Sequence, residues 1–475
     1  MENIIENILN NCKVIDLHSH LFPHEHVELC LYGIDNLLTY HYLISELFIV
    51  WNGLSPEEFF KLDKMTQADI IWSELFIKRS PISEACRGVI TTLKKLGLEK
   101  FIQSRDLNGI RNYLMNINPS NINNYIEQVF NLSNVDYTIM TNQIFEKNEI
   151  KYLDKIFIFN KGNKVIYKKD NEIEEVSILD CHRQSGDPGS YSICFNNGRE
   201  KNTLWKYLFM PDIAFNNITK RFKTSMRIDQ LIKDFDSCIK NPLLKQYGFS
   251  EDIEGVKNYI RYWNHFLRPE YFMASLEYDF CYDPSESDKE WSGTSSQIID
   301  KIIVPLSQEL DLPIAFKFDT RRGLNPLLRD GGDSLGVCNM ESLSKLCRNN
   351  PKCKFLVTFL SQVNQHQLCV LSRNFPNLHI YGCWWFLNNP SLIEQITRMR
   401  IEMLGLGFTA QHSDSRVLEQ LLYKWEHSRK IITRVLIEKY KDLQDSGWIF
   451  SKEEVERDVN YLFRDSYLNF IKKKL

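Results

Sequence analysis

Short apolar runs and longer amphipathic stretches alternate along this chain. The apolar runs have the length of strands and are rich in β-branched and aromatic residues, which favours strands over short helices. Strands that alternate with helices are typical of a parallel sheet that is buried on both faces. The predicted strands begin at Val14, Val135, Glu270, Pro313, Lys354, Leu378 and Met403.

Two stretches between these runs have apolar residues spaced by three and four, as in an amphipathic helix. One begins at Ser295, and the other begins at the pair Asn389 and Pro390; both are typical helix start signals. The chain has no repeat of fixed period and no low-complexity linker. The simplest interpretation is therefore one α/β domain over residues 1–475, with a helical excursion at 30–130 after the first strand.

The pattern weakens between residues 146 and 218, where the sequence becomes polar and rich in Asn and Lys. The segment contains "SGDPGS" at Ser185, a cluster of turn residues. We interpret it as an irregular insertion in the domain and not as a second core.

Composition narrows the class of protein. The chain has 475 residues, 43% of them hydrophobic, so it can bury a large core. Lys and Arg number 58 and Asp and Glu 61, a formal charge of -3, and no basic stripe is present. Nucleic acid is therefore not an expected partner.

The sequence also indicates a cytoplasmic protein. Its N-terminus lacks a signal pattern, and its longest apolar run, Leu47 to Trp51, is far too short to cross a membrane. The 12 cysteines are scattered without a CxxC pair, which favours reduced thiols over a disulfide framework. The oligomeric state stays open, with a homo-oligomer among the options.

The first predicted strand ends at His18 in "KVIDLHSHLFPHEH", and three more histidines follow it. His18 and His20 are two residues apart, so in an extended chain their imidazoles point to the same side and can share one ion. The alternative is a pair of core or surface histidines without a metal. For His24 and His26, which follow Pro23 in an expected loop, solvated side chains are the favoured interpretation.

A metal site needs a third ligand, and Asp414 in "QHSDSR" offers a carboxylate at the end of the last predicted strand. Ligands at the carboxyl ends of the first and last strands become neighbours only if the sheet closes on itself, as in a (β/α)8 barrel. The pattern thus predicts a barrel with His18, His20 and Asp414 at its mouth.

Several motifs together resemble the uronate isomerases, a branch of the amidohydrolase superfamily of metal-dependent (β/α)8 barrels. "IDLHSHL" resembles the family's "xDxHCHL", and "SMRID" at Ser225 is similar to "SWRPD". "RRGLNPLLRDGGDSLG" at Arg321 resembles "RRGVNPxxGDAGDxxG", and "WWF" at Trp384 followed by "SDSR" at Ser413 is similar to the closing elements. The resemblance covers nearly the whole chain, and the middle insertion matches poorly.

The resemblance implies interconversion of a hexuronate and its keto form, of the glucuronate and fructuronate type, through an enediol. It implies a divalent metal, zinc in our expectation, on His18, His20 and Asp414, with Asp414 also handling a hydroxyl proton. Tyr42, at the position of a conserved tyrosine, is implied as a proton shuttle. The implied substrate contacts are His41, Arg227, Arg322, Asp319 and Trp384, and Arg416 is implied among the catalytic residues as a further cationic group for a sugar carboxylate. The alternative for each of the three arginines is a structural ion pair.

The sequence departs from the family at three places. Lys317 stands where the family has a metal-pocket histidine, and Asp319 stands where it has a glycine. Ser45 replaces an arginine, and Thr141 begins a stretch that replaces acidic residues. Side chains alternate between the two faces of a strand, so we expect Lys317 to point into the barrel mouth. There it either pairs with Asp319 and contacts the substrate, or its pKa is lowered and it acts as a base.

Two alternatives remain open at this point. One is a metal-dependent hydrolase or decarboxylase of the same superfamily, with Lys317 and Asp319 as an acid and base pair. The other is a non-catalytic descendant that keeps the barrel as a scaffold for a sugar acid or a partner protein. Retained metal separates enzyme from scaffold, and conversion of a uronate to a ketose separates isomerase from hydrolase.

Overall fold

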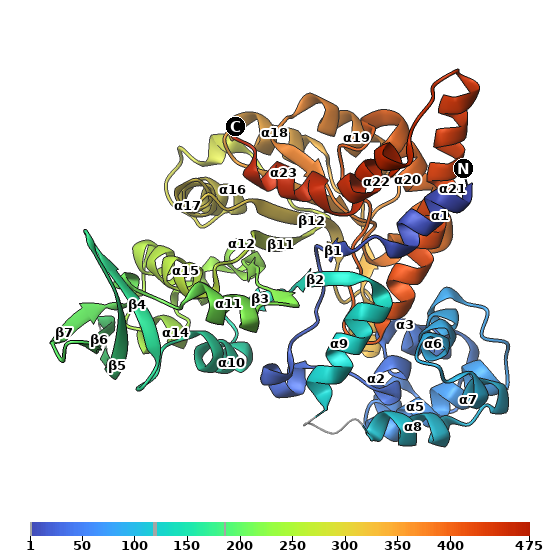
Figure 1. Cartoon of the computed structure of the whole chain (residues 1–475), viewed down its shortest axis with the longest axis horizontal. Coiled ribbons are helices and arrows are strands. Elements are labelled where there is room, and N and C mark those ends of the chain that lie inside the picture. Colours follow the sequence, from blue (N-terminus) through green and yellow to red (C-terminus); the bar gives the residue numbers. More distant parts are fainter. Residues whose placement is uncertain (1, 117–120, 185–186) are drawn as a thin grey trace.

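A parallel β-barrel forms the centre of the computed structural model (Figure 1). The structure describes residues 2–116, 121–184 and 187–475. In barrel order the strands are β1 (Val14–Asp16), β2 (Val135–Ile139) continued by β3 (Asn142–Gln143), β9 (Phe222–Lys223) continued by β10 (Met226–Arg227), β11 (Phe272–Glu277), β12 (Ile314–Arg321), β14 (Phe355–Phe359) and β15 (Leu378–Ile380). A single parallel bridge between Tyr381 and Thr409 marks the eighth strand position.

The barrel closes between its first and last positions through hydrogen bonds after the strands. The N–H of Asp414 donates to the carbonyl of His18 at 3.0 Å, and the N–H of His20 donates to the carbonyl of Ser415 at 2.7 Å. The predicted (β/α)8 barrel is thereby confirmed, although the predicted last strand is reduced to the bridge at Thr409.

Strand β12 lies between β11 and β14. A central parallel strand is covered on both faces, which explains why Ile314 to Phe318 is almost continuously apolar. Lys317 interrupts this run and Asp319 follows it, and both side chains are buried. These two charged residues of a buried strand therefore need partners, which the site supplies.

Helices surround the barrel and fill the space between its strands and solvent (Figure 1). The helix expected from Ser295 forms as α16 (Ser295–Ile298), a π-helical turn and α17 (Val304–Leu310). The helix expected from Asn389 forms as α20 (Pro390–Leu404), and the Asn389 side chain accepts a hydrogen bond from the N–H of Leu392. The main outer helices are α15 (Ile253–Leu267), α16 (Ser295–Ile298), η5 (Ile299–Ile303), α17 (Val304–Leu310), α18 (Glu341–Asn349), α19 (Gln365–Asn374), α20 (Pro390–Leu404) and α21 (Gln420–Asp445).

The chain between β1 and β2 forms a helical region beside the barrel mouth, drawn in blue to cyan in Figure 1. Several of its helices begin at side-chain caps, as when Ser83 accepts from the N–H of Cys86. Its elements are η1 (His24–Leu29), α2 (Ile34–Leu38), α3 (His41–Val50), α4 (Pro56–Phe59), α5 (Lys64–Ile71), η2 (Trp72–Ile77), α6 (Glu84–Lys95), α7 (Glu99–Ser104), α8 (Leu107–Met115) and α9 (Ile122–Ser133).

The segment 146–218, expected to be irregular, instead holds a five-stranded antiparallel sheet in the order β7-β6-β5-β4-β8. Its buried face is built by residues such as Val165, Tyr167, Val176 and Ile193, which alternate with Lys and Glu on the solvent side and so gave no continuous apolar signal. The elements are α10 (Lys147–Phe157), β4 (Lys164–Lys169), β5 (Glu172–Gln184), β6 (Asp187–Phe195), β7 (Glu200–Leu204), β8 (Leu208–Phe209) and α11 (Asp212–Ile218). The start of "SGDPGS", residues 185 and 186, lies outside the described residues.

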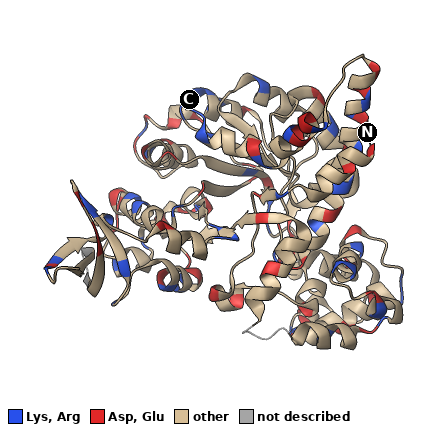
Figure 2. Ribbon diagram, in the orientation of Figure 1, with Lys and Arg blue, Asp and Glu red and all other residues tan. Residues whose placement is uncertain are grey.

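The remaining elements connect these regions and end the chain: α1 (Glu2–Asn11), η3 (Trp205–Tyr207), α12 (Asp229–Lys233), α13 (Phe235–Ile239), α14 (Pro242–Gln246), η4 (Pro284–Glu286), η6 (Pro326–Gly332), β13 (Ser334–Leu335), η7 (Trp385–Leu387), α22 (Lys452–Asn460), η8 (Tyr461–Asp465) and α23 (Ser466–Lys472). Figure 2 shows Lys and Arg interleaved with Asp and Glu over all regions of the fold.

Among the described residues, no helix combines the length and apolar character that crossing a membrane requires.

Candidate active site

Asp16, the last residue of β1, fixes the geometry of the barrel mouth. Its carboxylate accepts hydrogen bonds from the N–H of Ser413 at 2.9 Å and from the indole of Trp425 at 3.3 Å. Burial raises the pKa of Asp16 to about 6, and these hydrogen bonds oppose that rise. One acidic side chain thus ties the first strand to the loop that carries Asp414.

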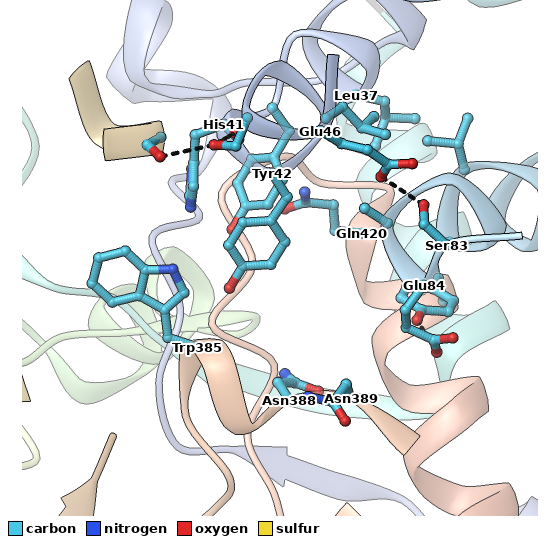
Figure 3. Close-up of a pocket in the computed structure, with 18 of the residues that line it drawn as sticks. Leu37, His41, Tyr42, Glu46, Ser83, Glu84, Trp385, Asn388, Asn389 and Gln420 are labelled. Carbon is cyan, nitrogen blue, oxygen red and sulfur yellow. Dashed lines mark hydrogen bonds between the residues drawn. The ribbon is translucent and has the colours of Figure 1, made fainter. Parts of the chain in front are cut away.

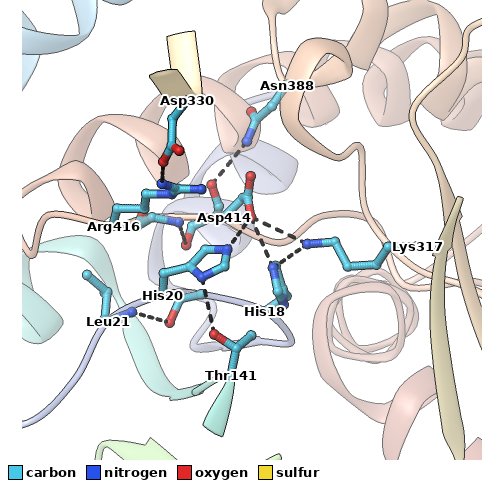
Figure 4. Close-up of polar contacts among 12 residues, drawn as sticks. His18, His20, Leu21, Thr141, Lys317, Asp330, Asn388, Asp414 and Arg416 are labelled. Atoms are coloured by element: carbon cyan, nitrogen blue, oxygen red, sulfur yellow. Dashed lines mark hydrogen bonds and ion pairs between the residues drawn. The ribbon is translucent and has the colours of Figure 1, made fainter. Parts of the chain in front are cut away.

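His18, His20 and Asp414 meet at this mouth (Figure 4). Asp414 Oδ1 lies 3.0 Å from His18 Nε2 and 3.5 Å from His20 Nε2, and the three ligand atoms all lie within 4.8 Å of one another. Two imidazoles and a carboxylate are a common donor set for a divalent ion that keeps a position open for a substrate. These residues therefore fit a divalent metal.

The protonation states of the three side chains also suit a metal. Burial lowers the pKa of His20 to about 3 and that of His18 well below its ordinary value, so both imidazoles are neutral near pH 7 and have a free lone pair. Burial opposes ionisation of Asp414, yet the charge of Lys317 and the contacts of His18 and His20 outweigh it and hold the pKa of Asp414 well below its usual range. Asp414 is therefore a carboxylate.

Lys317 points into the mouth from β12, as strand parity predicted. Its Nζ contacts His18 Nε2, lies 3.5 Å from Asp414 Oδ1 and is 4.2 Å from the ring centre of Trp384. Burial lowers the pKa of Lys317 to about 7; Asp414 opposes this change, and the charges of more distant arginines add to it. An amine that titrates near neutral pH thus lies beside the candidate metal ligands.

Asp319 does not pair with Lys317, so the expected pairing is wrong, and its contact with a substrate stays a prediction. Its carboxylate accepts from the backbone N–H groups of Cys338 at 2.8 Å and Ser361 at 2.9 Å, and also from the amide of Asn364. Its φ of 80° is in the left-handed region, which breaks the strand alternation that its expected position assumed. Asp319 is a buried acceptor that holds two loops together.

The three candidate arginines all reach the mouth, and each has a carboxylate partner in the chain. The nitrogen to oxygen distances are 2.6 Å for Arg227 to Asp229, 2.5 Å for Arg322 to Asp333 and 2.5 Å for Arg416 to Asp330. Their side chains are 19%, 34% and 29% exposed, so none is sealed from a ligand. A guanidinium has five N–H donors and can hold a second acceptor beside its ion pair.

Tyr42 and His41 begin α3 in the wall of the mouth. His41 Nε2 is buried and has no hydrogen-bond partner in the part of the chain that the structure describes. The Tyr42 hydroxyl is buried beside the Tyr40 side chain. Tyr42 stacks on Phe386 and lies edge-on to Tyr40. The role of Tyr42 as a proton shuttle stays a prediction, because Tyr42 forms no hydrogen bond with Asp414 or Lys317 among the described residues.

The positions that depart from the family have new partners. Ser45 donates to the carbonyls of His41 and Gly331 at 2.8 Å, which joins α3 to the loop of η6. The hydroxyl of Thr141 lies 3.2 Å from His20 Nδ1 and so orients that ring. His26 is buried between Phe22 and Tyr152, which corrects the expectation of a solvated side chain, while His24 is partly exposed.

Sequence reasoning missed two residues near the ligands. His412 is buried with its ring 5.4 Å from that of His18, and both of its ring nitrogens lack a partner among the described residues. Its place two residues before Asp414 was an available signal, because it repeats the His18 and His20 spacing. Lys424 on α21 is also buried, and nothing in the local pattern of that helix marks it.

The fold and the donor set at its mouth together define a metal-dependent (β/α)8 barrel of the amidohydrolase type. Solved structures similar to it include a uronate isomerase from Bacillus halodurans, which is 35% identical with a TM-score of 0.80, over 100% of this chain and 96% of that chain. The chain belongs to the uronate isomerase family.

Two more distant structures share the fold. A uronate isomerase from Thermotoga maritima is 14% identical with a TM-score of 0.70, over 99% of this chain and 97% of that chain. A glucuronate isomerase from Caulobacter crescentus is 12% identical with a TM-score of 0.66, over 99% and 93%. No family model and no curated protein sequence matches the chain.

Proposed function

We propose that this protein is a metal-dependent aldose–ketose isomerase that converts a hexuronate of the glucuronate or fructuronate type into its partner sugar through an enediol. Two findings support this proposal: membership in the uronate isomerase family and the similarity to solved uronate isomerases over nearly the full length. The observation that carries it is the convergence of His18, His20 and Asp414 at the carboxyl end of the barrel, where (β/α)8 enzymes have their active sites.

His18, His20 and Asp414 are the proposed metal ligands, and zinc is the proposed ion because two imidazoles and one carboxylate suit it. When bound, the ion supplies a Lewis acid that polarises a carbonyl or hydroxyl oxygen of the sugar. Thr141 beside His20 Nδ1 keeps the other ring nitrogen directed toward Asp414.

Proton transfer is assigned to this chain's own groups. Lys317 Nζ lies within reach of Asp414 Oδ1, and an amine of pKa about 7 both accepts and releases a proton near neutral pH. In the proposed reaction Lys317 holds the proton that moves between C1 and C2, and Asp414 handles a hydroxyl proton. Tyr42 is the further proposed acid and base.

Binding and orientation of the sugar acid are assigned to the cationic and aromatic groups around the mouth. Arg416, Arg322 and Arg227 are proposed to bind the distant carboxylate, because a guanidinium forms paired hydrogen bonds with a carboxylate. His41 and Trp384 are proposed to orient the sugar chain. Trp384 also covers Lys317 and so keeps water from its amine.

Conversion of a hexuronate, followed by NMR of the sugar together with elemental analysis of the purified protein, tests this function. We expect a ketose signal to appear at the expense of the aldose, with near-stoichiometric divalent metal. A product of lower mass would indicate a hydrolase or decarboxylase, and a metal-loaded protein that converts no uronate would contradict the proposal. Reconstitution of the metal-depleted protein with single ions, zinc among them, tests the identity of the metal.

We also propose a cytoplasmic location. The 12 cysteines are all free thiols in the structure, most of them buried, which suits a reducing compartment. Fractionation of cells that make the full chain tests the location.

A further inference from the structure

A chain of polar side chains joins the helical region to the loop that carries Asp414. Glu84, the first residue of α6, has its Oε1 2.9 Å from Nδ1 of His427 on α21. The other ring nitrogen of His427, Nε2, lies 3.0 Å from the side-chain oxygen of Asn388. Asn388 in turn donates from its amide nitrogen to the carbonyl of Ser413 at 3.2 Å. Figure 3 shows Glu84 and Asn388 in the lining of the cavity beside the mouth, and Figure 4 shows Asn388 beside the loop of Asp414.

The neighbours of the Asn388 amide fix its orientation. The side-chain oxygen of Gln411 accepts from the N–H of Cys383 at 2.5 Å, so the nitrogen of Gln411 is free to donate to the Asn388 oxygen at 3.3 Å. The carbonyl of Ser413 can only accept, so the Asn388 nitrogen must face it. The Asn388 oxygen therefore faces His427, and the contact is a hydrogen bond only if Nε2 of His427 has a proton.

The other end of His427 also faces an acceptor. Burial raises the pKa of Glu84, yet hydrogen bonds from His427, Arg87 and Tyr423 outweigh it and lower that pKa to about 2. Arg87 lies 2.8 Å from the carboxylate, and the hydroxyl of Tyr423, whose ring packs against that of His427, donates to it. An ionised carboxylate has no proton to donate, so Nδ1 of His427 must donate as well. An imidazole donates from both nitrogens only when it is protonated.

The surroundings of His427 allow it to lose that proton. Burial lowers the pKa of His427, Glu84 opposes this change, and the charges of Lys424 and Arg87 add to it. A neutral imidazole keeps one hydrogen for two acceptors. A hydrogen bond to a carboxylate is stronger than one to an amide oxygen, so the hydrogen stays on Nδ1 and the bond to Asn388 is lost.

We propose that His427 is a positioning residue for the loop of Asp414, which it holds through Asn388 only while both of its ring nitrogens are protonated. Asp414 has a φ of 51°, in the left-handed region, and a residue other than glycine keeps such a conformation only where its surroundings hold it. The N–H of Ser413 is bound by Asp16, and the bond from Asn388 holds the carbonyl of the same residue. The inference deepens the proposed function and rests on its ligand set, in which Asp414 binds the metal.

Two substitutions separate the two contacts of His427. The amide nitrogen of glutamine lies near the position of a histidine Nε2, and that of asparagine near the position of Nδ1. His427→Gln should therefore keep the bond to Asn388 at every pH, and His427→Asn should lack it. We expect metal affinity, measured by competition with a chelator, to be about fivefold weaker in His427→Asn than in His427→Gln, the size of one hydrogen bond. His265→Gln, which changes a histidine bound to the carbonyl of Leu208, should match wild type.

The wild-type protein should change from one behaviour to the other with pH. Its metal affinity should match that of His427→Gln where His427 is protonated and that of His427→Asn where it is neutral. Comparison at one pH at a time, from pH 4.5 to pH 8, cancels the protons on the ligands. Nitrogen-15 NMR of the His427 ring gives its protonation state, and both changes should have the same midpoint. A wild-type protein that matches one variant at every pH would overturn the proposal.

Hydrogen–deuterium exchange of the metal-free protein tests the same link without an ion. The N–H of Asp414, which donates to the carbonyl of His18, should exchange about fivefold faster in His427→Asn than in His427→Gln at the same pH. Equal exchange in the two variants would remove His427 from the positioning of this loop. A protein that shows the difference in exchange and binds no metal would contradict the ligand set and the proposed function, and would still support the link.

Discussion

Lys317 Nζ lies 3.5 Å from Asp414 Oδ1, and both side chains are buried at the barrel mouth. The chain therefore places a cationic group beside the carboxylate that a divalent ion needs. A divalent ion bound to Asp414 and the protonated amine of Lys317 would both be positive. They would repel each other strongly, because the site is shielded from water. Binding of the ion and protonation of Lys317 must consequently oppose one another, and the proposed reaction can use the neutral amine that results.

Replacing Lys317 tests this relationship. We expect Lys317→Ala to abolish turnover with the fold intact, because the proposed proton carrier is lost, and Lys317→His to tighten metal binding without necessarily restoring isomerisation. Turnover, circular dichroism and metal titration measure these outcomes. Lys354→Ala, a buried lysine that pairs with Asp311 before β14, is the matched control. Full activity of Lys317→Ala on the identified substrate would remove Lys317 from the mechanism.

Replacing Asp414 tests the metal site. Asp414→Asn should lower metal content markedly, since a neutral amide is a poorer ligand than a carboxylate. Elemental analysis after dialysis against a defined metal buffer gives the occupancy. Asp311→Asn, which changes a carboxylate at the other end of the barrel, should keep the metal. Equal occupancy in the Asp414→Asn and wild-type proteins would count against this ligand assignment.

Replacing Arg416 tests the binding of the sugar acid. Arg416→Gln should raise KM for a hexuronate roughly tenfold to a hundredfold, the range expected when a charged hydrogen bond of about 1.5–3 kcal/mol is lost. Steady-state kinetics on a uronate and on the matching neutral sugar separate carboxylate binding from general damage, because only the acid should lose affinity. Arg221→Gln, whose arginine pairs with Glu127 outside the mouth, is the control. An unchanged KM would assign the carboxylate to another residue.

Glu149 gives the protein a predictable pH dependence of stability. It is buried, and burial raises its pKa to about 7 from 4.5, although Gln143 and Asn142 donate to it. Between these pH values the folded state binds more protons than the unfolded state, so its contribution to stability falls as pH rises from about 4.5 to about 7. At pH 8 the Glu149→Gln protein should be more stable than wild type by about 3 kcal/mol, at 1.36 kcal/mol per pKa unit, with little difference at pH 4.5.

Urea unfolding at the two pH values measures this effect. Glu146→Gln, an exposed neighbour just before the same helix, should show no such difference between pH values. A Glu149→Gln protein whose stability follows wild type at both pH values would mean that Glu149 ionises normally in the folded state.

The parts of this fold with a strong local signal could be predicted from the sequence. Strands such as β12 and β14 are buried on both faces and are continuously apolar, and His18 and His20 were assigned one direction by strand geometry alone. The Asp319 assignment failed because it assumed regular alternation, which a positive φ interrupts. The sheet of β4 to β8 was missed because its outer face is rich in Lys and Glu, a composition that is also typical of loops.

Tertiary contacts set a firmer limit on prediction. Lys424 is buried in the folded chain, and the pattern of its own helix gives no sign of this. The carboxylate partners of the three candidate arginines also come from folded loops. An ion pair for each arginine could therefore be given as an alternative from the sequence, but its partner could not be predicted.

The hydrogen bond from Ser413 to Asp16 joins residues 397 positions apart. A metal centre that spans this distance has no partial form, because a chain that has been synthesised only as far as Thr409 holds two histidines and no carboxylate opposite them. Loading of the proposed site must therefore follow synthesis of the chain through Asp414, and the ion would bind only to molecules in which the ring has closed. In a cell, the amount of metal that this protein carries would then be a measure of how many copies have completed their folding.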